Sequence, residues 1–125
     1  MAEMNAWLLI AAINGFLAVA LGAFGSHGLE GRLSTKDLAT FETAVRYHMY
    51  HALALGLCAI ASPGARIEQL TVAGSLFTLG IILFCGSLYL YSVRHWRPLV
   101  YLTPFGGLAF LAGWAMLAWA AFTVG

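Results

Sequence analysis

Residues 70–93 read LTVAGSLFTLGIILFCGSLYLYSV, a run that contains no charged side chain. A lipid bilayer requires about 17 to 25 consecutive apolar residues of a spanning helix, and this run meets that length. Three further apolar runs cover 5–24, 43–62 and 99–124, and most charged residues fall between the four runs. The pattern predicts an all-α integral membrane protein, a bundle of four transmembrane helices.

The composition excludes most soluble classes of protein. Hydrophobic residues make up 62% of the chain and charged residues 9%, and the mean hydropathy is +0.86, whereas a soluble domain carries about 25% charged residues. The 125 residues allow one transmembrane domain, 1–125. A net charge of +1 gives no support for a nucleic-acid partner, so membrane lipids are the expected surroundings.

The second apolar run is expected to belong to a longer helix. Ser34-Thr35-Lys36-Asp37 resembles a helix N-cap, and no Gly or Pro follows until Gly56. A helix over 35–62 would be about 40 Å long, whereas the hydrocarbon core of a bilayer is about 30 Å thick. The sequence therefore predicts an interfacial helical extension before the second transmembrane helix.

Basic residues in the short loops predict the orientation in the membrane, because Lys and Arg are retained on the cytoplasmic side. The first and third loops carry Arg32, Lys36, Arg94 and Arg97, whereas the second loop carries Arg66. Both termini are therefore predicted on the non-cytoplasmic side of a multi-pass membrane protein.

Five polar residues are the candidate binding residues: His27, Arg46, Tyr47, His48 and His51. All are predicted near one membrane face, and they have two interpretations. They form either a polar cap on the bundle or a site for an anionic lipid headgroup, a quinone or a similar amphiphile. A metal site is disfavoured, because zinc requires three or four ligands and no cysteine or suitably placed carboxylate completes the histidines. No cofactor is predicted.

Small residues predict where the helices pack, since close backbone approach replaces the hydrophobic force that is absent in lipid. They recur at helical spacing on the first and fourth runs, with one further close contact on the third. The predicted packing positions are Gly15, Gly22, Gly25, Gly86, Gly106 and Gly113. Phe110 and Trp114 are expected to face lipid or a neighbouring subunit.

Two polar residues lie within the apolar runs, and the sequence suggests what surrounds each of them. Asn14 lies inside the first run and needs a hydrogen-bond partner, for which Ser75, Thr78 and Ser87 are the candidates. Tyr89 is expected to be an anchor at the membrane interface.

The chain also resembles a known family over nearly its whole length. The motifs are LGAFGSHGL at 21–29, FETAVRYHMYHALAL at 41–55, FCGSLY at 84–89, and TPFGG at 103–107 followed by Gly113-Trp114. In this order they resemble the YgdD-like family of small membrane proteins. The resemblance implies a four-helix protein of the bacterial inner membrane, with eukaryotic relatives and no known function. The family positions that it matches are Gly22, Gly25, His27, Gly28, Phe41, Ala44, Arg46, Tyr47, His51, Leu53, Gly86, Tyr89, Pro104, Gly106, Gly107 and Trp114.

Three functions fit these observations. The favoured one is a non-catalytic structural or accessory protein, which packs as a homo-oligomer or within a larger membrane complex. The alternatives are a binding module at the polar residues and, with less support, a small transporter or channel formed by an oligomer. An enzyme is not predicted, because no nucleophile with a base, no carboxylate pair and no phosphate loop can be assembled.

Overall fold

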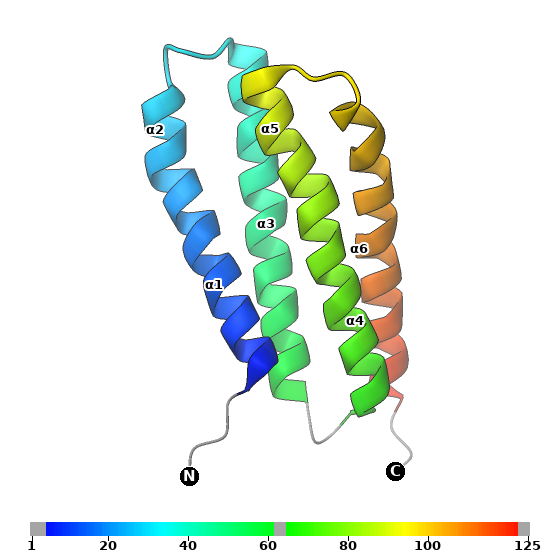
Figure 1. Cartoon of the computed structure of the whole chain (residues 1–125). Coiled ribbons are helices and arrows are strands. Elements are labelled where there is room, and N and C mark those ends of the chain that lie inside the picture. Colours follow the sequence, from blue (N-terminus) through cyan, green and yellow to red (C-terminus); the bar gives the residue numbers. More distant parts are fainter. Residues whose placement is uncertain (1–4, 62–64, 123–125) are drawn as a thin grey trace.

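Figure 1 shows the computed structural model, which describes residues 5–61 and 65–122; within them every regular element is a helix. The helices join end to end into four long rods. The first consists of α1 (Ala6–Ala20), the π-helical turn η1 (Leu21–Gly25) and α2 (Ser26–Leu29), and the second is α3 (Thr35–Ala61). The third consists of α4 (Ile67–Gly80), the π-helical turn η2 (Ile81–Cys85) and α5 (Gly86–Arg94), and the fourth is α6 (Leu99–Ala121).

The predicted class, an all-α membrane protein, is confirmed. Among the described residues, three helices are long and apolar enough to cross a membrane: Ala6–Leu29, Ile67–Arg94 and Leu99–Ala121. The additional helix is α3, whose sequence includes Arg46, His48 and His51.

The helix ends differ in part from the sequence boundaries. The α3 helix begins at Thr35, where the backbone N–H of Asp37 donates to Ser34 Oγ at 3.1 Å, as the capping pattern predicts. The first rod continues beyond Phe24 through η1 to Leu29, and the third begins three residues before Leu70. The predicted end of the second helix at 62–64 lies outside the described residues.

The rods form a row in chain order. The α1 helix packs against α3, α3 packs against α4 and α5, and α4 packs against α6 (Figure 1). One end, called the loop end below, carries residues 30–34 and 95–98. The opposite end, called the termini end, holds Asn5, Arg66 and Phe122, and here Arg66 Nε donates to the carbonyl of Phe122 at 2.8 Å.

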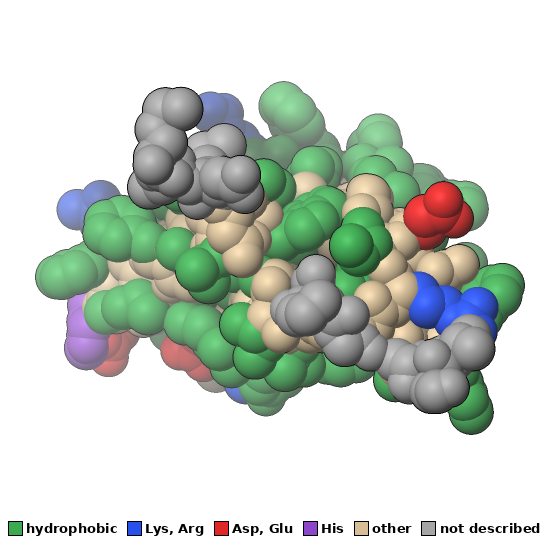
Figure 2. All heavy atoms as spheres, turned by 90° about the horizontal axis from the view of Figure 1, so that it is seen from below, with side chains coloured by type: hydrophobic (Ala, Val, Ile, Leu, Met, Phe, Trp, Pro, Cys, Tyr) green, Lys and Arg blue, Asp and Glu red, His purple; other side chains and the backbone are tan. Residues whose placement is uncertain are grey.

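Small residues fill the interior, and large apolar residues cover the outside. Ala18, Ala44 and Ala54 are at most 1% exposed, whereas Phe16 and Phe24 are more than 70% exposed. Seen from the termini end, hydrophobic side chains project outward around the molecule (Figure 2). Close helix contact inside and apolar surface outside are what a bilayer favours.

Four of the predicted packing glycines lie in tight contacts. A Cβ atom on Gly106 of α6 would lie against the backbone of Phe84 in η2, and one on Gly113 would lie 2.7 Å from the Phe77 ring. In η1, a Cβ atom built on Gly22 would lie 2.8 Å from an α3 side chain, and a Cβ atom built on Gly25 would lie 2.9 Å from another. The α6 and η2 backbones can therefore approach only because residue 106 has no side chain.

Gly15 and Gly86 have more open surroundings. No atom of another segment lies within 4 Å of a Cβ atom built on Gly15. For a Cβ atom built on Gly86, the nearest atom is the carbonyl oxygen of Ile81, which is 4.0 Å away and belongs to the same rod. Gly15 follows Asn14, which bonds to His48 of α3, so the open space lies beside this one residue of a helix that packs against α3.

Candidate functional site

Two buried histidines stand at the centre of the row, both on α3. His48 and His51 are each 4% exposed and lie three residues apart. Three residues turn a helix by less than a full circle, so the two rings leave α3 in different directions. His48 points between α1 and α5, and His51 points toward α4 and α6.

His48 joins three rods through both ring nitrogens. Its Nε2 donates to Asn14 Oδ1 of α1 at 3.0 Å, and its Nδ1 lies 3.0 Å from the Tyr89 hydroxyl of α5. Asn14 Nδ2 donates to the Ile10 carbonyl at 2.9 Å, which leaves Asn14 Oδ1 as the acceptor. A neutral imidazole protonated at Nε2 satisfies both contacts, because its Nδ1 then accepts from the Tyr89 hydroxyl.

His51 has the opposite tautomer. Its Nδ1 donates to the Tyr47 carbonyl at 2.7 Å, and the Trp114 indole N–H donates to its Nε2 at 3.1 Å. Since an indole nitrogen can only donate, Nε2 must carry a lone pair and the ring must be neutral. The ring also stacks on Phe110, with centroids 3.5 Å apart and planes 7° from parallel. The Phe110 and Trp114 contacts hold α6 to α3.

The predicted partners of Asn14 were wrong. Ser75 and Thr78 each donate to a carbonyl one turn earlier in α4, and Ser87 bonds within the third rod and to Thr103. The reason is the order of the row, because α1 packs against α3 and α3 carries His48 at the level of Asn14.

Two aromatic residues also lie further inside than predicted. Tyr89 is half-buried with its hydroxyl on His48, and Phe110 is only 4% exposed and lies against His51. Phe110 is four residues from Gly106 and three from Gly113, a spacing that places it on the packed face of α6. That spacing could have identified Phe110 from the sequence.

His27 and Arg46 lie apart from the two buried histidines. His27 is exposed, with its Nδ1 3.8 Å from Glu30 Oε2, and Arg46 donates to Thr43 Oγ1 at 3.1 Å. They line a groove of about 460 Å³ between the first rod and α3, together with Glu30 and Glu42. Glu42 and Arg46 lie four residues apart on α3, but no ion pair within 4 Å joins them.

The single polar cluster predicted from the sequence is therefore divided. His27 and Arg46 line the groove beside α1, Tyr47 and His51 line a second groove beside α6, and His48 lies between the helices. Over residues 5–61 and 65–122, no group of three or more His, Cys, Asp or Glu side chains could hold a metal ion.

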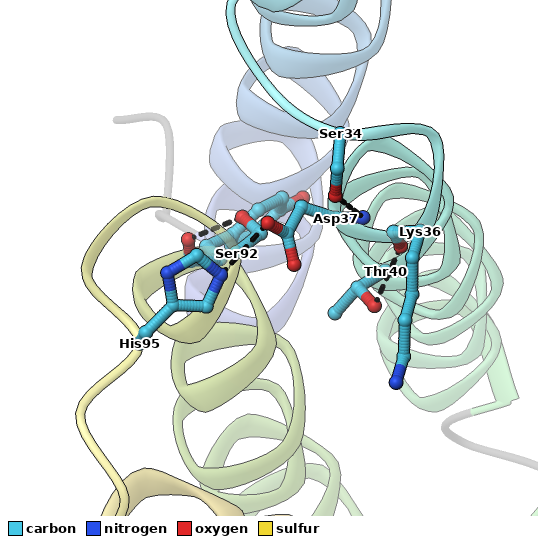
Figure 3. Close-up of polar contacts among 7 residues, drawn as sticks. Ser34, Lys36, Asp37, Thr40, Ser92 and His95 are labelled. Atoms are coloured by element: carbon cyan, nitrogen blue, oxygen red, sulfur yellow. Dashed lines mark hydrogen bonds and ion pairs between the residues drawn. The ribbon is translucent and has the colours of Figure 1, made fainter.

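No sequence pattern signals one further contact, between Asp37 and His95. His95 Nε2 lies 2.7 Å from Asp37 Oδ2, although the residues are 58 positions apart (Figure 3). His95 ends α5 in the left-handed region with φ 54°, which few residues other than glycine adopt. The contact fastens the third loop to the first turn of α3.

An all-helical chain with three candidate spans, an apolar outer surface and internally paired histidines is an integral membrane protein. It belongs to the family described as "Protein of unknown function (DUF423)", whose model matches residues 21–107. This match, together with the relatives described next, confirms the family resemblance found in the sequence.

The relatives carry names of the same kind. The UPF0382 membrane protein YwdK of Bacillus subtilis is 48% identical over 119 residues, which cover 94% of this chain and 97% of the relative. The UPF0382 inner membrane protein YgdD of Escherichia coli is 41% identical over 111 residues, which cover 88% and 84%. No solved structure matches the chain significantly. The protein is thus a membrane protein of a family without an assigned function.

The Asn14–His48 hydrogen bond can be tested with a double-mutant cycle of Asn14→Ala and His48→Ala. Interhelical hydrogen bonds in membrane proteins contribute about 0.6 kcal/mol on average, so we expect a coupling energy of about that size. Unfolding of the reconstituted protein in mixed micelles measures it. Asn14→Ala combined with Trp114→Phe is the control and should give additive effects; additivity in the Asn14–His48 cycle as well would contradict the bond.

Proposed function

We propose that this protein is a non-catalytic structural or accessory protein of the bacterial inner membrane, a bundle in which all four rods cross the bilayer. The observation that carries the proposal is that the polar groups in the interior are hydrogen-bonded to one another or to the backbone. Among the described residues, every buried side-chain nitrogen or oxygen has a hydrogen-bond partner. His48 and His51 use both of their ring nitrogens in hydrogen bonds, so neither imidazole is free to act as a base or a ligand.

The position of α3 supports its crossing of the membrane. The chain leaves α2 at the loop end and enters α4 at the termini end, so α3 connects the two ends (Figure 1). The α3 helix also packs against both α1 and α4, which belong to two of the apolar candidate spans. The polar side chains that lower its hydropathy include His48 and His51, which are buried and paired and would not contact lipid.

The first turns of α3 form the interfacial extension in this proposal. The helix has 27 residues, about 40 Å against a hydrocarbon core of about 30 Å. Its surplus is the segment that carries Lys36, Asp37 and Glu42. These side chains would lie among the lipid headgroups at the loop end.

The loop end is the cytoplasmic end in this proposal. It carries Arg32, Lys36, Arg94 and Arg97, whereas Arg66 lies at the termini end. Because basic loop residues stay in the cytoplasm during insertion, both termini would lie outside it.

Fusions at the C-terminus test this orientation. Alkaline phosphatase fused after Gly125 should be active and green fluorescent protein at the same place dark, because phosphatase folds only outside the cytoplasm. The same reporters inserted after Gly31 in the first loop should give the opposite pattern. Equal signals at the two positions, or a reversed pattern, would contradict the proposed topology.

The accessory role requires packing with further copies or with a larger membrane complex. The outer faces of α1 and α6 offer large apolar residues for such packing, for example Phe16 and Phe105. A binding module at His27 and Arg46 has weaker support, since Glu30 and Glu42 share their groove and offset the positive charge. A channel also has little support, because none of the described Asp, Glu, Lys or Arg residues is buried.

Native mass spectrometry of the full chain, extracted in mild detergent, separates the accessory protein from the binding module. The parent is compared with His27→Ala/Arg46→Ala, whose exposed side chains can be removed without opening the core. The proposal predicts identical bound species in both proteins. A stoichiometric small molecule on the parent that disappears in the variant would replace the accessory role with a binding module.

A further inference from the structure

A long groove runs along the face of the row between α3 and α6. These two helices flank the third rod, whose residue Phe84 forms the floor between them. Two hollows of about 420 and 540 Å³ meet there and share Phe84 and Gly107. The two hollows therefore adjoin at Phe84 and Gly107, and together they are called the α3–α6 groove.

The upper part of the α3–α6 groove reaches the loop end. It is lined by Thr40 of α3, Tyr91 of α5, and Val100, Thr103 and Pro104 of α6. Its mouth is therefore partly polar, whereas its floor is apolar.

A lysine stands at this mouth. Lys36 is one helical turn before Thr40, and the two side chains lie on the same side of α3 (Figure 3). Lys36 has no carboxylate within 4 Å among the described residues. Its neighbour Asp37 is engaged by His95 at 2.7 Å. Lys36 does not line the hollow itself, but its exposed side chain lies one turn from the lining residue Thr40, toward the loop end.

The lower part is apolar and aromatic. Tyr47 and Tyr50 of α3 face Phe110, Leu111 and Trp114 of α6 across it. From Val100 to Trp114 the groove extends along 15 residues of α6, whose ends are about 21 Å apart at the rise of a helix. One leaflet of the hydrocarbon core is about 15 Å thick, so the groove can hold an acyl chain over its full depth in the leaflet.

We propose that the α3–α6 groove binds one anionic phospholipid, with its phosphate at Lys36 and an acyl chain past Phe84 and Gly107. Transfer of a chain from the bilayer to the groove gives little hydrophobic gain, because lipid tails are as apolar as the groove. The preference for an anionic phospholipid therefore comes from charge complementarity at the mouth and from the shape of the groove. The proposal requires membrane insertion and is independent of the accessory role.

Two variants test the head and the tail of the site separately. Lys36→Gln removes the charge at an exposed position, with Arg32→Gln as the matched control in the same loop region. Gly107→Leu fills the junction of the hollows, where the nearest atom to a built Cβ is Phe84 Cδ2 at 4.0 Å. Gly15→Leu is its control, a helical glycine with open space beside α1 and away from the groove.

The experiment titrates the delipidated full chain with phosphatidylglycerol or phosphatidylcholine of identical chains, and native mass spectrometry counts the bound lipid. The parent should bind one phosphatidylglycerol about fivefold more tightly than phosphatidylcholine, the effect of one lysine near anionic lipid. Lys36→Gln should lose that preference, and Gly107→Leu should weaken both lipids about tenfold. Both control variants should bind like the parent.

Several outcomes would overturn the proposal. These are equal binding of the two lipids by the parent, unchanged binding by both groove variants, or the same loss in the controls. Displacement by free glycerol phosphate would indicate a phosphate site without a lipid chain. His27→Ala/Arg46→Ala should retain the lipid, because neither residue lines the groove, so this test can fail while the accessory role stands.

Discussion

The fold depends on one constraint: polar side chains inside a membrane bundle have no water and must be paired within the protein. The two histidines of α3 meet that constraint. His48 takes its partners from α1 and α5, and His51 takes its external partner from α6. Because each imidazole uses one nitrogen as donor and the other as acceptor, the two rings tie the rods together without a buried charge. The same pairing connects α3 to α1, α5 and α6.

The order in which the rods pack decides which residues of α3 share a groove. One groove lies between the first rod and α3 and another lies between α3 and α6, and the two open on different residues of α3. The polar residues that the sequence places together, such as His27 and His51, are separated by this arrangement. The tight contact of Gly106 with the Phe84 backbone brings α6 against η2. Gly107, the next residue, leaves the α3–α6 groove open.

Much of the architecture can be predicted from the sequence, because the bilayer fixes the length and hydropathy of its helices. Ser34 and Asp37 indicate the start of α3, and the glycines at 106 and 113 indicate the packed face of α6. The partners in the interior could not be predicted in the same way. The Asn14–His48 contact depends on which helix α1 packs against, and the Asp37–His95 contact joins residues 58 positions apart. Helical spacing describes one helix at a time and does not determine the rotation of two helices about each other.

The α3 helix carries two neutral histidines of opposite tautomer, each bound to a different neighbour. Imidazole nitrogen chemical shifts from solid-state NMR of the protein in lipid bilayers measure the tautomers directly, with His48→Gln and His51→Gln variants to assign the signals. This assignment of protons implies that at neutral pH His48 carries its proton on Nε2 and His51 carries its proton on Nδ1. The same tautomer for both rings, or an imidazolium at either position, would contradict it.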